Sequence, residues 1–143
     1  MAQPPRIPVL IPDHKEVIYF VTLCVENRLP VLANPLACTA FQHAIEKADR
    51  WMTLSAVLMP DHFHALVAPK NRSLSIGLYS AAIKRWTRQE LKADWKWQKG
   101  CFDRLLRNNE TAQAKWAYLR ENPVRAGLVS HWEKWPYSWG FSL

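Results

Sequence analysis

Two histidines, His62 and His64, lie one residue apart in the otherwise apolar stretch 57-VLMPDHFHALVAP-69. In a β-strand, residues at positions i and i+2 point to the same face, roughly 6.6 Å apart along the chain. Two imidazoles on one face can bind a single metal ion together. The alternative is that each histidine is an ordinary core or edge residue. Two histidines also do not complete a metal site, because most metal ions need further ligands.

The elements that would position this pair follow from the apolar pattern along the chain. Strands are predicted where β-branched, aromatic and aliphatic residues form short runs: 17–25, 53–59, 62–68 and, more ambiguously, 97–107. Helices are predicted where apolar residues recur at helical spacing: 35–50, 74–92 and 110–122. This order predicts an α+β fold, an antiparallel sheet with flanking helices that is similar in outline to the ferredoxin-like fold.

Local turn and cap signals support these boundaries. Pro60 and Asp61 separate two apolar runs, which is a hairpin signal. Asn34 and Pro35 are typical of an N-cap and a first helical residue. Pro123 is expected to stop or redirect the last helix.

The predicted helix over 74–92 has two unlike faces. At 100° per residue, its apolar residues fall on one arc: Ile76, Tyr79, Ala82, Ile83 and Trp86. Its basic residues fall on roughly the opposite arc: Lys84, Arg85, Arg88 and Lys92. With Arg104 and Arg107 from the next segment, these cations are candidates for binding a DNA backbone, and the alternative is an ordinary solvated surface.

The net charge of +7 is unevenly distributed. Residues 1–70 hold equal numbers of basic and acidic residues, whereas 71–143 hold thirteen basic and six acidic ones and so carry the whole excess. Most of the tryptophans lie in that second part as well. Basic residues among aromatic ones suit phosphate neutralisation and base stacking, although basic proteins also include many that bind no nucleic acid.

Length and composition predict one domain over 1–143, because 143 residues with 49% hydrophobic composition suffice for a single core. The proline-rich segment 1–14 is expected to be an extended arm. No run of eighteen apolar residues occurs, so we expect a cytoplasmic protein without a membrane partner. Three widely spaced cysteines do not suggest a disulfide framework or a cysteine-rich zinc site.

Four segments in order carry a family resemblance: 57-VLMPDHFHALV-67, 97-WQKGCFDRLLR-107, 118-YLRENPVRAGLV-129 and 135-WPYS-138. Together they resemble the single-tyrosine HUH transposases, and more narrowly the group associated with repetitive extragenic palindromes. The resemblance spans nearly the whole chain, from about Tyr19 to Ser138. It implies the HUH endonuclease fold and an enzyme that cuts and rejoins single-stranded, hairpin-containing DNA.

The resemblance also implies roles for individual residues. Tyr118 matches the nucleophile, which becomes joined to DNA through a 5′-phosphotyrosine. His62 and His64 match the ligands of a divalent metal ion, Mg²⁺ or Mn²⁺. The side-chain amide of Asn122 matches the ligand that completes this metal site. Asp61 departs from the family, in which asparagine is common at this position, and places a negative charge beside the site. A homodimer is one option for the oligomeric state.

Other interpretations stay open at this point. Asn122 before Pro123 is also a good N-cap, and Tyr118 could be a core tyrosine. Two other functions are consistent with the residues. One is a nucleic-acid-binding module without catalysis, and the other is a metal-dependent nuclease with water as the nucleophile. A covalent protein–DNA product separates the three functions, because only the transposase forms one.

Overall fold

The computed structural model describes residues 17–71, 73–106 and 111–140, so the arm predicted over 1–14 lies outside the described residues. Its elements are β1 (Tyr19–Cys24), η1 (Glu26–Arg28), α2 (Pro35–Lys47), β2 (Trp51–Leu58), β3 (His62–Pro69), α3 (Ile76–Leu91), β4 (Phe102–Leu105), α4 (Ala112–Leu119), α5 (Asn122–Arg125), η2 (Trp132–Lys134) and β5 (Ser138–Trp139). In these ranges no helix is long and apolar enough to cross a membrane.

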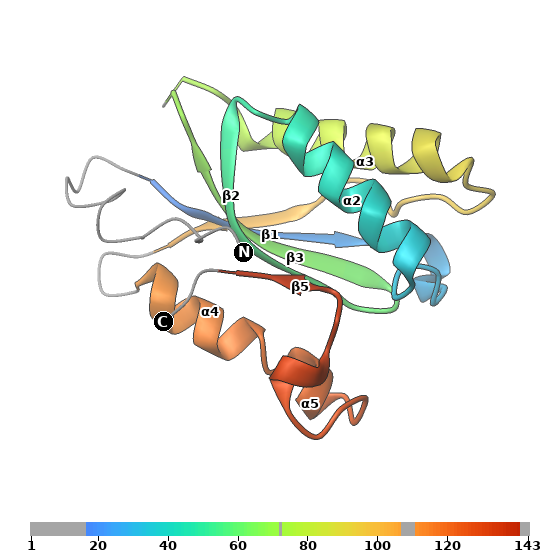
Figure 1. The fold of residues 1–143 in the computed structure, drawn as a ribbon. Helices are drawn as coiled ribbons and strands as arrows, with labels where there is room; N and C mark the ends of the chain where they lie inside the picture. Colours follow the sequence, from blue (N-terminus) through green and yellow to red (C-terminus); the bar gives the residue numbers. More distant parts are fainter. Residues whose placement is uncertain (1–16, 72, 107–110, 141–143) are drawn as a thin grey trace.

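The five strands form one antiparallel sheet in the order β4-β1-β3-β2-β5 (Figure 1). The first four strands and their two helices follow each other as β-α-β-β-α-β, which is the ferredoxin-like connection. β5 is added beside β2 at one edge. The predicted α+β class and the antiparallel sheet with flanking helices are therefore confirmed.

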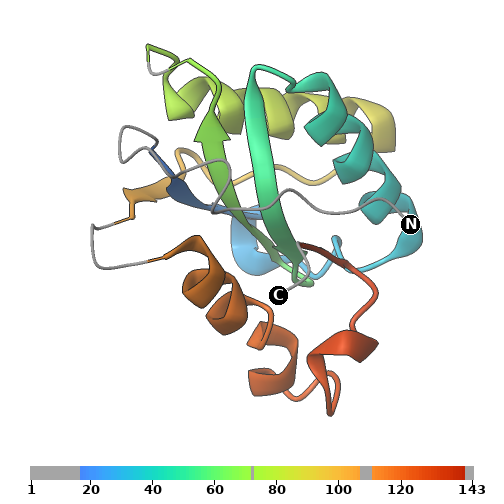
Figure 2. The ribbon, with the colours of Figure 1, turned by 60° about the vertical axis from the view of Figure 1, so that its left-hand side comes forward.

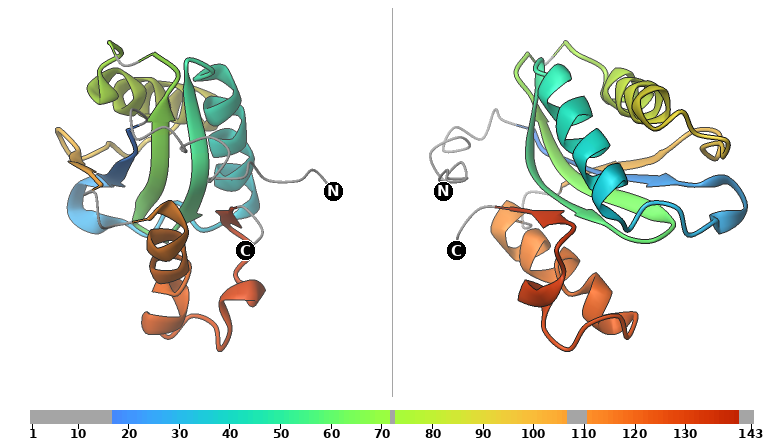
Figure 3. Two further views of the ribbon diagram at one scale, coloured as in Figure 1. Left: turned by 90° about the vertical axis from the view of Figure 1, so that its left-hand side faces the viewer. Right: turned by 45° about the vertical axis from the view of Figure 1, so that its right-hand side comes forward.

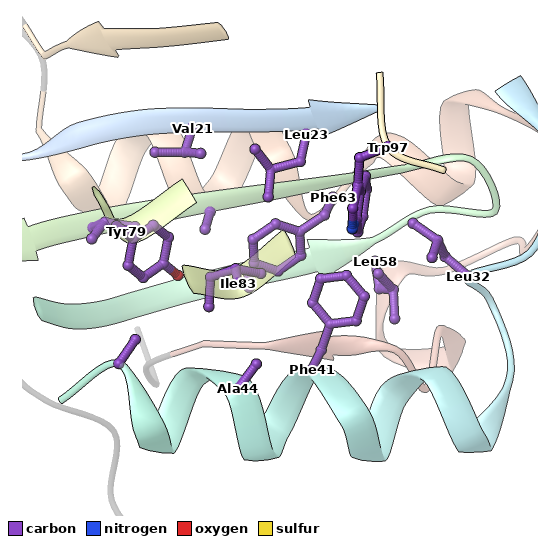
Figure 4. Close-up of a cluster of buried hydrophobic side chains, with 14 of the residues drawn as sticks. Val21, Leu23, Leu32, Phe41, Ala44, Leu58, Phe63, Tyr79, Ile83 and Trp97 are labelled. Atoms are coloured by element: carbon purple, nitrogen blue, oxygen red, sulfur yellow. The ribbon is translucent and has the colours of Figure 1, made fainter. Parts of the chain in front are cut away.

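Helices cover both faces of the sheet. α2 and α3 pack side by side on one face, while α4 lies against the other (Figures 1 and 3). Between the sheet and α2, Phe41 stacks on Phe63 with ring centroids 4.7 Å apart, and Trp97 meets Phe41 edge-on (Figure 4). A second, smaller core forms under α4, where Trp116 and Leu119 are buried. The two faces are thus separate environments.

Successive side chains of β3 point to opposite faces of the sheet, and this alternation decides on which face the histidines lie. Phe63 belongs to the core under α2 and α3, whereas Leu66 belongs to the core under α4. His62 and His64 alternate with Phe63 and so share the α4 face. The shared face predicted for this pair is confirmed, and the opposite core holds the hairpin in register.

The helix predicted over 35–50 ends at Lys47, and two further predicted segments are wrong in ways that bear on the site. The strand predicted over 97–107 forms only at Phe102–Leu105. The helix predicted over 110–122 ends at Leu119, and a separate short helix, α5, begins at Asn122. Pro123 has no N–H to donate to the carbonyl of Leu119, so the hydrogen-bond ladder of α4 stops there, while proline fits the first turn of α5. The expectation that Pro123 redirects the helix is confirmed.

The C-terminal clasp, residues 132–140, returns from α5 to the sheet (Figure 2) and packs against one side of α4. Trp135 donates from Nε1 to the carbonyl of Leu58 at 3.0 Å. The indole of Trp132 lies edge-on to that of Trp116 at 6.4 Å. A β-carbon added at Gly140 would overlap the Trp116 ring, so the clasp approaches α4 as closely as glycine permits.

Candidate active site

The two histidine rings lie next to each other, edge to face, at the turn end of β3. Their centroids are 4.6 Å apart and their planes are inclined at 75°. His62 Nδ1 contacts Asp61 Oδ1 at 2.7 Å, and His64 Nδ1 shares a hydrogen bond of 2.9 Å with the hydroxyl of Thr22. Because Nδ1 of both rings is engaged by the protein, Nε2 is the atom through which each could bind a metal ion.

Asp61 connects His62 to a cation. Its second carboxylate oxygen accepts from Arg28 Nε at 2.7 Å. Burial alone would raise the pKa of Asp61, but hydrogen bonds from Arg28 and His62 outweigh it, so the pKa lies below its ordinary value. The carboxylate is therefore ionised at neutral pH, and it can accept a hydrogen bond from Nδ1 of His62 when that nitrogen carries the proton.

His64 is held in its neutral form. Burial, reinforced by the positive charges of Lys115, Arg28 and Arg125 and by neighbouring His62, lowers the pKa of His64 to about 3. Neutral imidazole is the form that binds metal ions. The same interactions show that α4 and α5 bring positive charge close to the histidine pair.

Tyr118 lies on α4 and is exposed, with 58% of its surface accessible. Lys115 Nζ lies 5.3 Å from the centre of its ring, and Arg125 Cζ lies 4.2 Å from it. Lys115 is also 4.7 Å from the ring of Phe20, which lies 5.2 Å from the ring of His64. These contacts link the tyrosine to the histidine pair, and the alternative of a core tyrosine is wrong.

The other tyrosines are less suited to attack a phosphate. Tyr79 is fully buried and shares a hydrogen bond of 2.8 Å with Thr53. Burial raises the pKa of its hydroxyl well above the ordinary value, which disfavours phenolate. Tyr19 and Tyr137 are half-buried. Tyr118 is therefore the only exposed tyrosine of the chain, whose four tyrosines all lie within the described residues.

Asn122 is not a cap. The N-cap of α5 is Glu121, so the capping interpretation of Asn122 is wrong. Instead, the side-chain oxygen of Asn122 accepts a hydrogen bond from Arg125, whose guanidinium also donates to the backbone carbonyl of Tyr118 at 2.9 Å. Arg125 thus joins the two residues across the break between α4 and α5, although they do not share one helix.

The basic residues of α3 lie elsewhere, because α3 covers the sheet face opposite to α4 (Figure 3). Lys84 donates from Nζ to the carbonyls of Gln98, at 3.0 Å, and Gly100. Arg88 donates to the carbonyls of Trp95 and Ala93 at 2.9 and 3.2 Å. Both side chains hold the connection from α3 to β4, and the interpretation as a purely solvated face is wrong for them.

The remaining DNA-binding candidates differ in position. Arg85 and Lys92 are exposed on α3, and Arg85 lies over the ring of Trp86 at 5.2 Å. Arg104 pairs across β1 with Phe20, so it shares the face of the histidines. Arg107 lies outside the described residues. The structure therefore brings Arg104, and none of the α3 cations, to the sheet face of the histidine pair.

The two kinds of α3 cation should respond differently to mutation. We expect Lys84→Met to lower the free energy of unfolding by about 1–3 kcal/mol, because it removes charge-assisted hydrogen bonds to two carbonyls. Lys92→Met, at an exposed position, should leave stability within about 0.5 kcal/mol of the parent. Urea denaturation followed by circular dichroism measures both, and equal midpoints would contradict a structural role for Lys84.

Several residues around the histidines were missed by sequence reasoning. They are Thr22, Arg28, Lys115 and Arg125. Lys115 precedes Tyr118 by three positions and Arg125 follows Asn122 by three, so helical spacing could have found both. Thr22 and Arg28 come from distant parts of the chain and leave no local signal.

The histidine pair can bind a divalent ion only if further ligands complete the coordination shell. Within 17–71, 73–106 and 111–140, no group of three histidine, cysteine, aspartate or glutamate side chains converges as a metal site. Two imidazoles with engaged Nδ1 atoms suit such an ion, and an amide or phosphate oxygen would complete the shell. The residues present therefore fit Mg²⁺ or Mn²⁺ held partly by a substrate.

Known proteins resemble this chain in sequence and in fold. No family model matches the chain. A curated protein of Haemophilus influenzae, named "Putative REP-associated tyrosine transposase", is 24% identical over 139 residues, covering 85% of this chain and 78% of that protein.

Two solved structures share the fold. A REP-associated tyrosine transposase bound to a REP hairpin superposes with a TM-score of 0.75 and 23% identity, covering 85% of this chain and 75% of that one. A protein described as a putative transposase from Deinococcus radiodurans gives a TM-score of 0.53 and 17% identity, covering 75% of this chain and 90% of that one. The resemblance to the REP-associated tyrosine transposases is thus confirmed by a curated relative and by a shared fold.

Proposed function

We propose that this protein is a transposase that cuts and rejoins single-stranded DNA containing a hairpin, with Tyr118 as the nucleophile. The observation that carries the proposal is the position of Tyr118. It is exposed on α4, has two cations close to its ring, and is linked through Lys115 and Phe20 to His64 of the histidine pair. The relative bound to a REP hairpin supports a hairpin as the substrate.

The reaction is a transesterification. The Tyr118 hydroxyl loses its proton and attacks phosphorus, forming a phosphotyrosine bond to the 5′ side of the cut. The bond from phosphorus to the 3′ oxygen breaks, and that oxygen leaves as a 3′-hydroxyl after taking up a proton. Because one phosphate ester bond replaces another, a different 3′-hydroxyl can reverse the step and rejoin the strand without ATP.

The cations beside Tyr118 have a task in this reaction. Negative charge builds up on the phosphate oxygens as attack proceeds, and fixed positive groups stabilise it more than they stabilise the ground state. Arg125 has a planar guanidinium that can bind two phosphate oxygens at once. Lys115, which also lies near the ring, supplies a point charge, so both residues are proposed to hold the phosphate at Tyr118.

His62, His64 and the amide of Asn122 are proposed to hold Mg²⁺ or Mn²⁺. Such an ion, when bound, polarises the phosphate and orients it for in-line attack. The side-chain oxygen of Asn122 already accepts a hydrogen bond from Arg125, but a carbonyl oxygen has two lone pairs and can serve a second partner. The neutral state of His64 supports this assignment.

A labelled single-stranded DNA hairpin library tests the proposal. The protein is incubated with the library and Mn²⁺, and the products are separated on a denaturing gel. We expect a protein–DNA band that survives denaturation and disappears after protease treatment. Binding without cleavage would establish a non-catalytic binding module, and free 5′-phosphate ends without any adduct would establish a nuclease that uses water.

A further inference from the structure

Three side chains are linked at the hairpin turn between β2 and β3: Asp61 in the turn, His62 at the start of β3 and Arg28 of η1. Asp61 contacts His62 Nδ1 through one carboxylate oxygen and Arg28 Nε through the other, each at 2.7 Å. Arg28 Nη2 also approaches His62 Nδ1 at 3.4 Å. One carboxylate therefore bridges the imidazole and the guanidinium, and its two oxygens serve different partners.

The backbone that carries Arg28 has an unusual conformation. Asn27 and Arg28 have φ angles of 61° and 54°, the left-handed region that residues other than glycine rarely adopt. Such a conformation costs roughly 1–2 kcal/mol per residue. Arg28, the second residue of this pair, carries the guanidinium that reaches Asp61. The backbone of the same segment is also tied to the turn, because the Asp61 carbonyl accepts from the N–H of Val25 at 3.0 Å. Strain concentrated at a candidate site is typical of a functional constraint.

We infer that Asp61 is a positioning residue that, supported by Arg28, fixes His62 in the tautomer with a proton on Nδ1 and a lone pair on Nε2. The inference rests on the proposed role of His62 as a metal ligand. A carboxylate only accepts hydrogen bonds, so Nδ1 must carry the proton. The bonded carboxylate also raises the donor strength of Nε2 and fixes the ring orientation.

Arg28 has a separate task in this arrangement. It occupies the second oxygen of Asp61 and thereby prevents the carboxylate from rotating away from the imidazole. Removing the Arg28 side chain leaves the Asp61 carboxylate in place as an acceptor but allows it to rotate. Removing the Asp61 carboxylate takes away the acceptor itself, so the Asp61 variant should have the larger effect.

The chain offers a matched control on the opposite face of the sheet. His43 of α2 contacts Glu90 of α3 through Nδ1 at 2.9 Å, which is the same kind of histidine–carboxylate pair. This pair is exposed. Glu90→Ala therefore removes an equivalent hydrogen bond without touching the proposed site.

The experiment compares the parent with Asp61→Ala, Asp61→Asn and Glu90→Ala. The tautomer of His62 is read from ¹⁵N NMR shifts of its ring, and the affinity for Mn²⁺ alone is measured by EPR of the free ion. We expect a parent with Nδ1–H, and an Asp61→Ala variant with mixed tautomers and about 10–100-fold weaker Mn²⁺ binding. Asp61→Asn, which retains a neutral acceptor, should lose less, and Glu90→Ala should match the parent.

The outcomes separate the inference from the proposed function. Unchanged tautomer and Mn²⁺ affinity in Asp61→Ala would overturn the inference, even if the parent forms a covalent DNA adduct. Conversely, Asp61-dependent Mn²⁺ binding with no adduct would uphold the inference and overturn the transposase assignment. If Asp61→Ala does not fold, Arg28→Gln provides the same two measurements, with a smaller expected loss, and an unchanged result there overturns the role of Arg28.

Discussion

We expect that replacing Tyr118 with phenylalanine will leave a folded protein that still binds hairpin DNA but forms no covalent adduct with it. The substitution removes only the attacking oxygen, while the ring contacts with Lys115 and Arg125 remain. Since no other group replaces a missing nucleophile, the yield of adduct should fall by at least about 10³-fold. Denaturing gels measure the adduct, and fluorescence anisotropy with labelled hairpin DNA measures the binding.

Tyr137→Phe is the matched control for this change. Tyr137 is half-buried in the C-terminal clasp and packs edge-on against Trp135 at 5.4 Å. Its variant should form adduct at the level of the parent. A denaturation-resistant band from Tyr118→Phe would mean that the nucleophile lies elsewhere in the chain.

Alanine at either His62 or His64 should abolish metal-dependent cleavage. Each substitution removes one of only two imidazoles, and a single remaining imidazole leaves the proposed ion with too few protein ligands. We expect a loss of about 10²–10⁴-fold for each variant, and little further loss in the double variant, because the two residues act as one unit. Initial rates of hairpin cleavage over a range of Mn²⁺ concentrations provide the measurement.

His43→Ala is the control here, because His43 lies on α2, across the sheet from the pair. It should cleave like the parent. Single variants of His62 and His64 that both cut as fast as the parent in Mn²⁺ would show that the pair does not hold the ion. Thermal denaturation of each variant distinguishes lost ligation from lost folding.

The sequence predicts the histidine face well because that face depends on local geometry alone. Alternation along β3 places His62 and His64 on the same side whatever the rest of the chain does. The Asn34 cap of α2 is local as well, since its side chain reaches the N–H of Ala37. Elements whose signals are contained within a few residues were therefore predictable.

Contacts between distant segments were not predictable in the same way. The ion pair of Arg28 with Asp61 joins residues 33 positions apart, and nothing in the sequence marks Arg28 as a partner. Helical periodicity identified the basic arc of α3 correctly, but it could not show that Lys84 and Arg88 turn back onto the following loop. The layer in which a helix packs is a property of the whole fold, so the separation of α3 from the candidate site appeared only in three dimensions.

The C-terminal clasp has a consequence for the order in which the site is assembled during translation. Every candidate ligand and the nucleophile have been synthesised by Asn122, yet residues 132–140, which pack against one side of α4, follow later. A nascent chain that has emerged only as far as α5 thus holds the histidine hairpin beside a tyrosine helix that is still open on one side. The packing of residues 132–140 against α4 is complete only when β5 pairs with β2, so the candidate site reaches its final surroundings after these residues have left the ribosome.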